Sequence, residues 1–81
     1  MAMTNLEKYD KAFMVNLKVK KEDLPGLKYQ GIATWDSVGH MDLISDLEEA
    51  FGIMMETIDV MDFNTYEHGK EVLAKYDVKI E

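Results

Sequence analysis

Ser37 is the residue of this sequence whose setting points most clearly to chemistry. It follows Asp36 and precedes a segment with the periodicity of an amphipathic helix, so the pair lies at a predicted helix N-terminus. Either residue can cap that terminus by accepting a hydrogen bond from a backbone N–H that would otherwise lack a partner. A phosphate esterified to Ser37 would also lie in the favourable field of the helix start, although the Asp36 carboxylate would repel it. Asp36 and Ser37 are therefore consistent with two interpretations, a helix cap and an attachment site for a phosphate ester.

The segment after Ser37 has one apolar face and one acidic face. At about 100° per residue, its apolar residues share a broad arc: Met41, Leu43, Ile44, Leu47, Ala50 and Phe51. Asp42, Asp46 and Glu49 lie within roughly 60° of one another on the opposite side, where each like-charged pair costs roughly a few tenths of a kcal/mol. A basic partner would explain this clustering, and the simpler interpretation is the solvated face of a soluble helix.

The two histidines are weaker candidates for chemistry. His40 falls on the apolar arc one turn after Ser37, but a hydrolytic pair also needs an orienting acid, an oxyanion hole and a pocket. An 81-residue bundle leaves little room for these, and His68 is expected to be solvated on the last helix. The acidic runs that begin at Asp59 and Asp62 lack the ligands or the glycine of a calcium loop. We therefore predict no catalytic residue and no metal site.

Charge and composition disfavour several classes of protein. Sixteen acidic residues against nine lysines give a net charge of −7, which disfavours nucleic-acid binding and favours partners with basic docking patches. The chain has no cysteine, so thioester chemistry would need a thiol from a prosthetic group. No run is apolar and long enough to span a membrane, and the start shows no signal-peptide pattern. We expect a cytoplasmic monomer.

These residues must be positioned by a single all-α domain over residues 1–81, a small four-helix bundle of three main helices and one short one. The helices are predicted at about 5–17, 37–51, 56–61 and 65–76. Capping-box patterns at 4–7 and 64–67 mark the start of the first and last helices, and Gly52 ends the second helix. Residues 77–81, after the last helix, are expected to fray. The methionines of 53–63 are interpreted singly as core gap-fillers.

A long loop must join the first two helices. Residues 18–34 show no sustained helical period and contain a Pro25-Gly26 turn. Four apolar side chains should hold the loop against the bundle: Leu24, Leu27, Tyr29 and Ile32. Ordered loops of this length are often functional, and this one must deliver Ser37 to the start of the second helix. Trp35 could face a partner, but packing as an anchor is the favoured interpretation.

The residues from Leu24 to Leu73 resemble an acyl carrier protein, most specifically between Trp35 and Ile53. The resemblance rests on four short motifs and their spacing: Asp36-Ser37-Val38, Leu43-Ile44, Leu47-Glu48-Glu49 and Phe51-Gly52-Ile53. The family's length of about 80 residues and its acidic charge agree with it.

This resemblance implies that Ser37 carries 4′-phosphopantetheine, which a phosphopantetheinyl transferase takes from coenzyme A. The thiol of this arm holds an acyl or aminoacyl group as a thioester and presents it to ligase, synthase or transferase enzymes with basic docking patches. The chain itself would not be a catalyst. The positions that match the family's docking surface are Asp36, Val38, Asp42, Asp46, Glu48 and Glu49.

Two departures from the family's pattern bear on the pathway. Fatty-acid carriers usually have an acidic residue two places after the serine, where this chain has Gly39, and their Ile-Pro after the second helix is replaced by Met54-Met55. These departures disfavour a fatty-acid role. Trp35 before the motif and Gly39-His40-Met41 after it look more like carriers in specialised pathways, such as D-alanyl transfer, surface-polysaccharide modification, or polyketide or peptide assembly. The alternative is a small acidic helical adaptor without a prosthetic group, in which Ser37 is only an N-cap.

Overall fold

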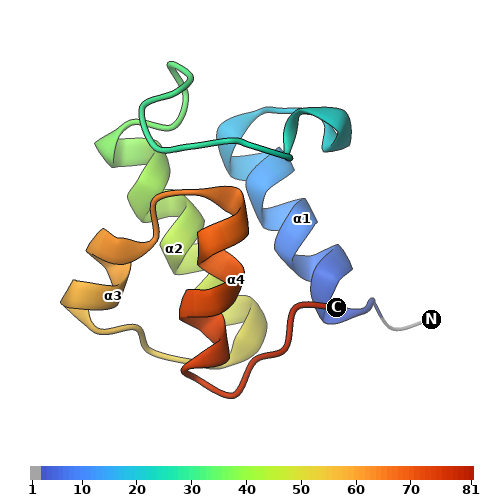
Figure 1. Cartoon of the computed structure of the whole chain (residues 1–81), viewed down its shortest axis with the longest axis vertical. Helices are drawn as coiled ribbons and strands as arrows, with labels where there is room; N and C mark the ends of the chain where they lie inside the picture. The colour runs from blue at the N-terminus through green and yellow to red at the C-terminus, as the bar shows by residue number, and fades with distance from the viewer. Residues whose placement is uncertain (1–2) are drawn as a thin grey trace.

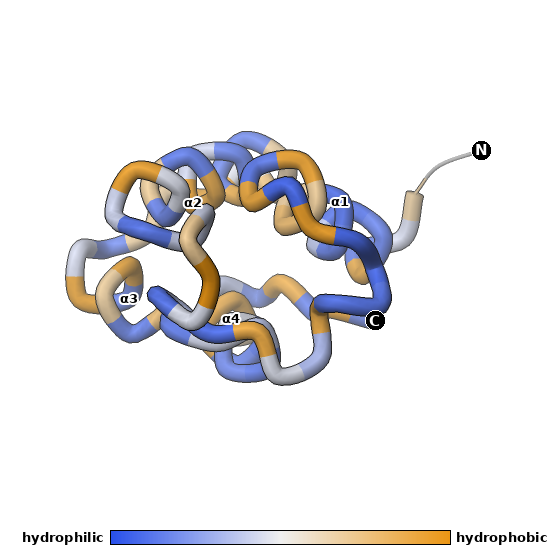
Figure 2. Tube along the Cα trace, turned by 90° about the horizontal axis from the view of Figure 1, so that it is seen from above, coloured by the Kyte–Doolittle hydropathy of each residue, from blue (hydrophilic) through white to orange (hydrophobic). Residues whose placement is uncertain are grey.

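The computed structural model describes residues 3–81, which form four α-helices and no strand (Figure 1). The helices are α1 (Asn5–Leu17), α2 (Ser37–Phe51), α3 (Thr57–Asp62) and α4 (Tyr66–Ala74). The prediction of an all-α fold is confirmed. Seen from above, α1 and α2 lie in one layer and α3 and α4 in the other (Figure 2). None of the helices within residues 3–81 is long and apolar enough to cross a membrane.

Local sequence signals set the ends of α1 and α2. The Thr4 hydroxyl accepts a hydrogen bond from the Glu7 amide at 3.1 Å, and the Glu7 carboxylate accepts one from the Thr4 amide at 2.9 Å. This reciprocal pair is the predicted capping box, and it lowers the pKa of Glu7 because both bonds to Thr4 favour the carboxylate. Gly52 follows α2 in the left-handed conformation at φ 64°. Both helices have the predicted bounds.

The other two helices differ slightly from the prediction. The helix expected over 56–61 begins one residue later, because Glu56 is extended and stands before it. The helix expected over 65–76 ends at Ala74, where the amides of Lys75 and Tyr76 bond three residues back and tighten the chain into turns. Its cap is also one residue later than expected. Thr65 accepts the bond from the His68 amide at 2.9 Å.

The core is built around aromatic side chains. Fully buried Phe13 contacts Trp35 edge-on, with ring centroids 5.4 Å apart, and stacks on Phe63 at 6.0 Å. Tyr9 is also fully buried and donates its hydroxyl to the Tyr66 carbonyl oxygen at 2.6 Å, which ties α1 to α4. Trp35 is thus the packing anchor that the sequence favoured, and it fixes the chain immediately before Ser37.

The loop between α1 and α2 is fastened to the junction of α3 and α4. The Tyr29 amide donates to the Asn64 carbonyl and the Tyr66 amide donates to the Leu27 carbonyl, each at 2.9 Å. Leu24 and Leu27 are buried, and Tyr29 and Ile32 are partly buried against the core, as predicted. The loop contains a 3₁₀ turn at Lys21–Asp23. Its attachment at this junction fixes where the chain enters α2.

The expectation that residues 77–81 fray is wrong. Val78 is 8% exposed and belongs to the core, and Ile80 packs against it. The Asn5 side-chain amide donates to the Lys79 carbonyl at 2.9 Å, so the C-terminal segment returns to the beginning of α1 (Figure 1). Two apolar residues in five are enough to hold this short tail against the bundle.

Candidate functional site

Ser37 is the first residue of α2 and its side chain is exposed. The cap is supplied by Asp36, whose Oδ1 accepts a hydrogen bond from the Gly39 amide at 2.8 Å. Within residues 3–81 the Ser37 hydroxyl has no hydrogen-bond partner. The sequence left open which of the two residues caps the helix, and the structure assigns that role to Asp36. Ser37 is therefore available for another purpose.

Gly39 occupies a position where there is no space for a side chain. A Cβ built on Gly39 would overlap the backbone carbonyl oxygen of Thr34, which cannot move as a flexible side chain can. Gly39 is buried on this side of α2 by the chain that leads into the helix. The chain before α2 therefore leaves no space for a side chain at this position.

An apolar hollow opens beside Ser37. Its volume is about 330 Å³, and it lies between the start of α2, the α3 segment and the loop before α2. The residues around it come from these three parts of the chain: Tyr29, Ser37, His40, Met41, Val60, Met61, Phe63 and Asn64. The hydroxyl of Ser37 thus belongs to a surface recess of a size that could receive part of a small group attached to it.

His40 occupies the inner side of this hollow, and both of its ring nitrogens are engaged. Its Nδ1 is 2.9 Å from the Trp35 indole Nε1, and its Nε2 is 2.7 Å from the Val60 carbonyl oxygen. Because the indole N–H can only donate, Nδ1 must accept and the neutral ring carries its proton on Nε2. No ring nitrogen is left to accept the Ser37 proton. This geometry argues against a Ser37–His40 pair of nucleophile and base.

The carboxylates that the sequence placed on the docking side of α2 divide into two groups. Asp46 accepts a hydrogen bond from the Asn16 side chain at 2.8 Å, and Glu48 accepts one from the Met55 amide at 2.8 Å. These two half-buried carboxylates hold α2 to α1 and to the segment after Gly52. Asp42 and Glu49 are exposed and, within residues 3–81, make no ion pair or side-chain hydrogen bond. Sequence periodicity alone could not separate Asp46 from Asp42 and Glu49, because the distinction depends on tertiary partners.

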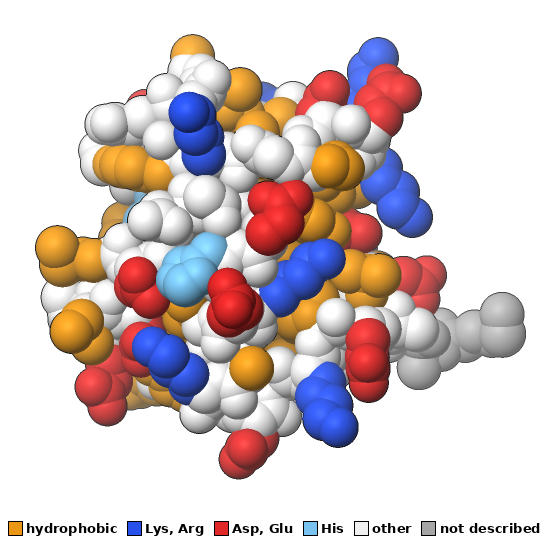
Figure 3. Space-filling model, in the orientation of Figure 1, with side chains coloured by type: hydrophobic (Ala, Val, Ile, Leu, Met, Phe, Trp, Pro, Cys, Tyr) orange, Lys and Arg blue, Asp and Glu red, His pale blue; other side chains and the backbone are white. Residues whose placement is uncertain are grey.

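Apolar side chains are exposed at the start of α2 and on α3. Val38 is 68% exposed and Met41 53%, while Ile58 and Met61 on α3 are 71% and 75% exposed. The space-filling view shows apolar side chains gathered at the edge of the molecule where α3 lies (Figure 3). Met54, before α3, is exposed as well. The interpretation of the methionines as core gap-fillers is therefore wrong for Met54 and Met61, and holds for buried Met55.

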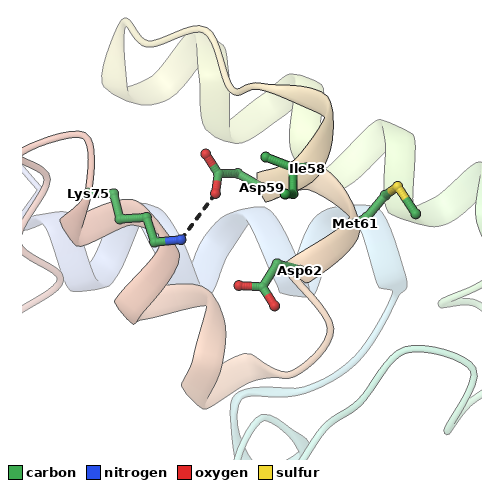
Figure 4. A pocket seen from close by; sticks show the side chains of 5 residues that line it. All are labelled: Ile58, Asp59, Met61, Asp62 and Lys75. Carbon is green, nitrogen blue, oxygen red and sulfur yellow. Dashed lines mark hydrogen bonds and ion pairs between the residues drawn. The ribbon is translucent and has the colours of Figure 1, made fainter.

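A second hollow, of about 490 Å³, lies between α3 and the end of α4, and Ser37 is not among the residues that line it. Asp59 and Lys75 face each other across it, with Oδ1 and Nζ 3.3 Å apart (Figure 4). The hydrogen bond from the Tyr76 hydroxyl, and then Lys75, lower the pKa of Asp59. These contacts fasten α3 to the chain after α4. We interpret this hollow as a structural junction.

His68 is also paired with carboxylates and is not simply solvated. Its Nε2 is 2.9 Å from Asp62 and its Nδ1 is 3.0 Å from Glu71. The hydrogen bonds to these two carboxylates raise the pKa of His68 because they favour the protonated ring. Within residues 3–81 no group of three metal-ligating side chains is close enough to hold a metal ion.

Comparison of the chain with models of known protein families, with curated proteins and with solved structures gives no match.

Proposed function

We propose that this protein is a carrier of the acyl carrier type, with 4′-phosphopantetheine attached to Ser37. The observation that carries the proposal is the state of Ser37, an exposed hydroxyl without a partner at a helix start that Asp36 already caps. A structural serine at this place would be expected to bond to the helix backbone. The adaptor alternative explained Ser37 as the N-cap of this helix, and the cap supplied by Asp36 removes that explanation.

The surroundings of Ser37 suit such an arm. The N-terminus of α2 favours the negative charge of a phosphodiester, and the adjacent apolar hollow can accommodate part of a flexible attached chain. When bound, the arm supplies the thiol that the cysteine-free chain lacks, and this thiol carries an acyl or aminoacyl group as a thioester. The protein's own part is to tether that group and so raise its effective concentration at each partner enzyme.

We further propose that the four helices form a carrier-type four-helix bundle, whose long loop between α1 and α2 places Ser37 on the docking side. The proposed docking surface comprises the exposed acids Asp36, Asp42 and Glu49 with the exposed apolar residues Val38 and Met41. Its partners are a phosphopantetheinyl transferase and acyl or aminoacyl ligases and synthases with basic patches. Charged contacts of this kind speed association and still allow rapid release, as a cytoplasmic shuttle requires.

The pathway is proposed to be a specialised one. Gly39 stands where fatty-acid carriers have an acidic residue, and the Thr34 carbonyl leaves no space there for a side chain. A partner that contacts an acid at this place would lose that contact here.

The test is the intact mass of the purified protein after incubation with coenzyme A and a permissive phosphopantetheinyl transferase. The chain offers a matched control, because its second serine, Ser45, is also exposed on α2. We expect the wild type and Ser45→Ala to gain one phosphopantetheine and Ser37→Ala to gain none. Absence of any gain on folded wild type, with more than one transferase, would contradict the proposal and favour the adaptor.

A further inference from the structure

His40 forms a bridge between α2 and α3 at the inner side of the hollow. Its Nε2 reaches the Val60 carbonyl at 2.7 Å, and its Nδ1 holds the Trp35 indole N–H at 2.9 Å. One side chain thus joins the start of α2, the middle of α3 and the residue that anchors the loop. A group that moved from the hollow toward the core between α2 and α3 would have to pass this bridge.

The space behind His40 is filled by rings. The centroid of the His40 ring lies 6.1 Å from that of Trp35, 6.2 Å from that of Phe63 and 5.2 Å from that of Tyr29. Trp35 and Phe63 have no exposed surface, and Phe13 packs against both. Interiors packed in this way do not accept added atoms without displacing side chains.

Opening the route would also leave a polar group unsatisfied. If His40 moved away, the buried Trp35 indole N–H would lose its acceptor, and an alkyl guest taking the place of His40 would offer none in return. A guest chain would therefore have to displace an aromatic ring and break a hydrogen bond to a buried donor. By contrast, the hollow outside His40 is open at the surface, and Met41 and Met61 at its rim have flexible side chains.

We propose that His40 determines where the cargo lies: it closes the core to the group carried on Ser37, so that this group stays outside the bundle whatever its chain length. This inference rests on the proposed carrier function and adds to it the place of the cargo. A long alkyl chain on the arm would remain outside the bundle and would gain no burial from it.

The test uses the wild-type protein loaded at Ser37 from acetyl-, butyryl-, octanoyl- and palmitoyl-coenzyme A by a permissive transferase. Two quantities are measured for each form: the Tm relative to the form with the free thiol, and the rate at which hydroxylamine cleaves the thioester. We expect the octanoyl and palmitoyl forms to equal the butyryl form in both. A Tm that rises with chain length by about several degrees, together with several-fold protection of the thioester, would overturn the inference.

Two variants of His40 test its role, each compared with its own free-thiol form so that any loss of stability cancels. His40→Leu removes both hydrogen bonds, and we expect its Tm and thioester protection to rise with chain length. His40→Gln keeps an acceptor for Trp35 and a donor for Val60, and we expect it to behave as the wild type. If His40→Leu showed no dependence on chain length, His40 would not be the determinant. Failure of Ser37 to accept any arm would instead refute the carrier function and this inference with it.

Discussion

Asp36 contributes to the protein in two ways that substitutions can separate. Its side chain caps α2, and its negative charge lies beside Ser37. Its Oδ1 accepts the Gly39 amide at 2.8 Å, and loss of such a cap costs about 0.5–2 kcal/mol of unfolding free energy. For a domain of this size, each kcal/mol lowers the Tm by about 4–8 °C. We therefore expect Asp36→Ala to lower the Tm by several degrees.

Asp36→Asn retains an oxygen that can accept the same hydrogen bond and removes only the charge. The charge is worth about 0.3–1 kcal/mol at a helix N-terminus in low salt, and salt screens it. We therefore expect Asp36→Asn to approach wild-type stability in high salt, while Asp36→Ala remains destabilised. Urea unfolding followed by circular dichroism at low and high salt measures both effects.

The same pair of variants tests whether the charge assists the proposed modification. The initial rate of phosphopantetheine transfer should fall for both variants, and it should depend less on salt than the wild-type rate does. If Asp36→Asn were as unstable as Asp36→Ala in high salt, the cap would not depend on the side-chain oxygen of residue 36. An Asp36→Asn protein modified at the wild-type rate at every salt concentration would refute the electrostatic part alone.

Three further predictions follow from the site. Asp42→Asn should slow phosphopantetheine transfer and change the free energy of unfolding by less than about 0.5 kcal/mol. Asp46→Ala should lower the free energy of unfolding by about 0.5–1.5 kcal/mol, because it loses the hydrogen bond from Asn16 on α1. Equal stability of the two variants would contradict the division of the acidic face. Gly39→Asp should lower the free energy of unfolding by about 1–3 kcal/mol in urea titrations, because its Cβ meets the Thr34 carbonyl, and an unchanged midpoint would refute that close approach. The raised pKa of His68 means that its protonated form stabilises the fold, so this contribution is fully present below the unfolded pKa of about 6.5 and is lost as pH rises through the higher folded pKa. His68→Gln should therefore remove part of the fall in stability between about pH 6 and about pH 8, and an identical pH profile for both proteins would count against the pairing with Asp62 and Glu71.

Features that depend on near neighbours in the chain could be predicted from the sequence. The bonds between Thr4 and Glu7 span three residues, and the left-handed conformation after α2 needs only Gly52. The prediction was less accurate where distant residues compete. Glu67 was expected to complete a cap with Asn64, but its carboxylate accepts the Gly26 amide at 2.9 Å, from the loop before α2. The cap at Thr65 bonds to the His68 amide instead.

The candidate site shows the same limit. Ser37 and Asp36 could be selected from the sequence, because their spacing relative to one helix carries the signal. The hollow and the bridge through His40 could not be predicted, since they depend on Val60, twenty residues later, lying across from α2. His40 was expected only to lie on the apolar arc. Knowledge of the α2–α3 contact was needed to see that both of its nitrogens are used.

The most direct test of the central claim is the mass of the Ser37-containing peptide from the protein expressed in its own cells. We expect this peptide to carry one phosphopantetheine, alone or acylated, with the modification at Ser37 and not at Ser45. Folded protein from those cells with an unmodified Ser37 would rule out the carrier function.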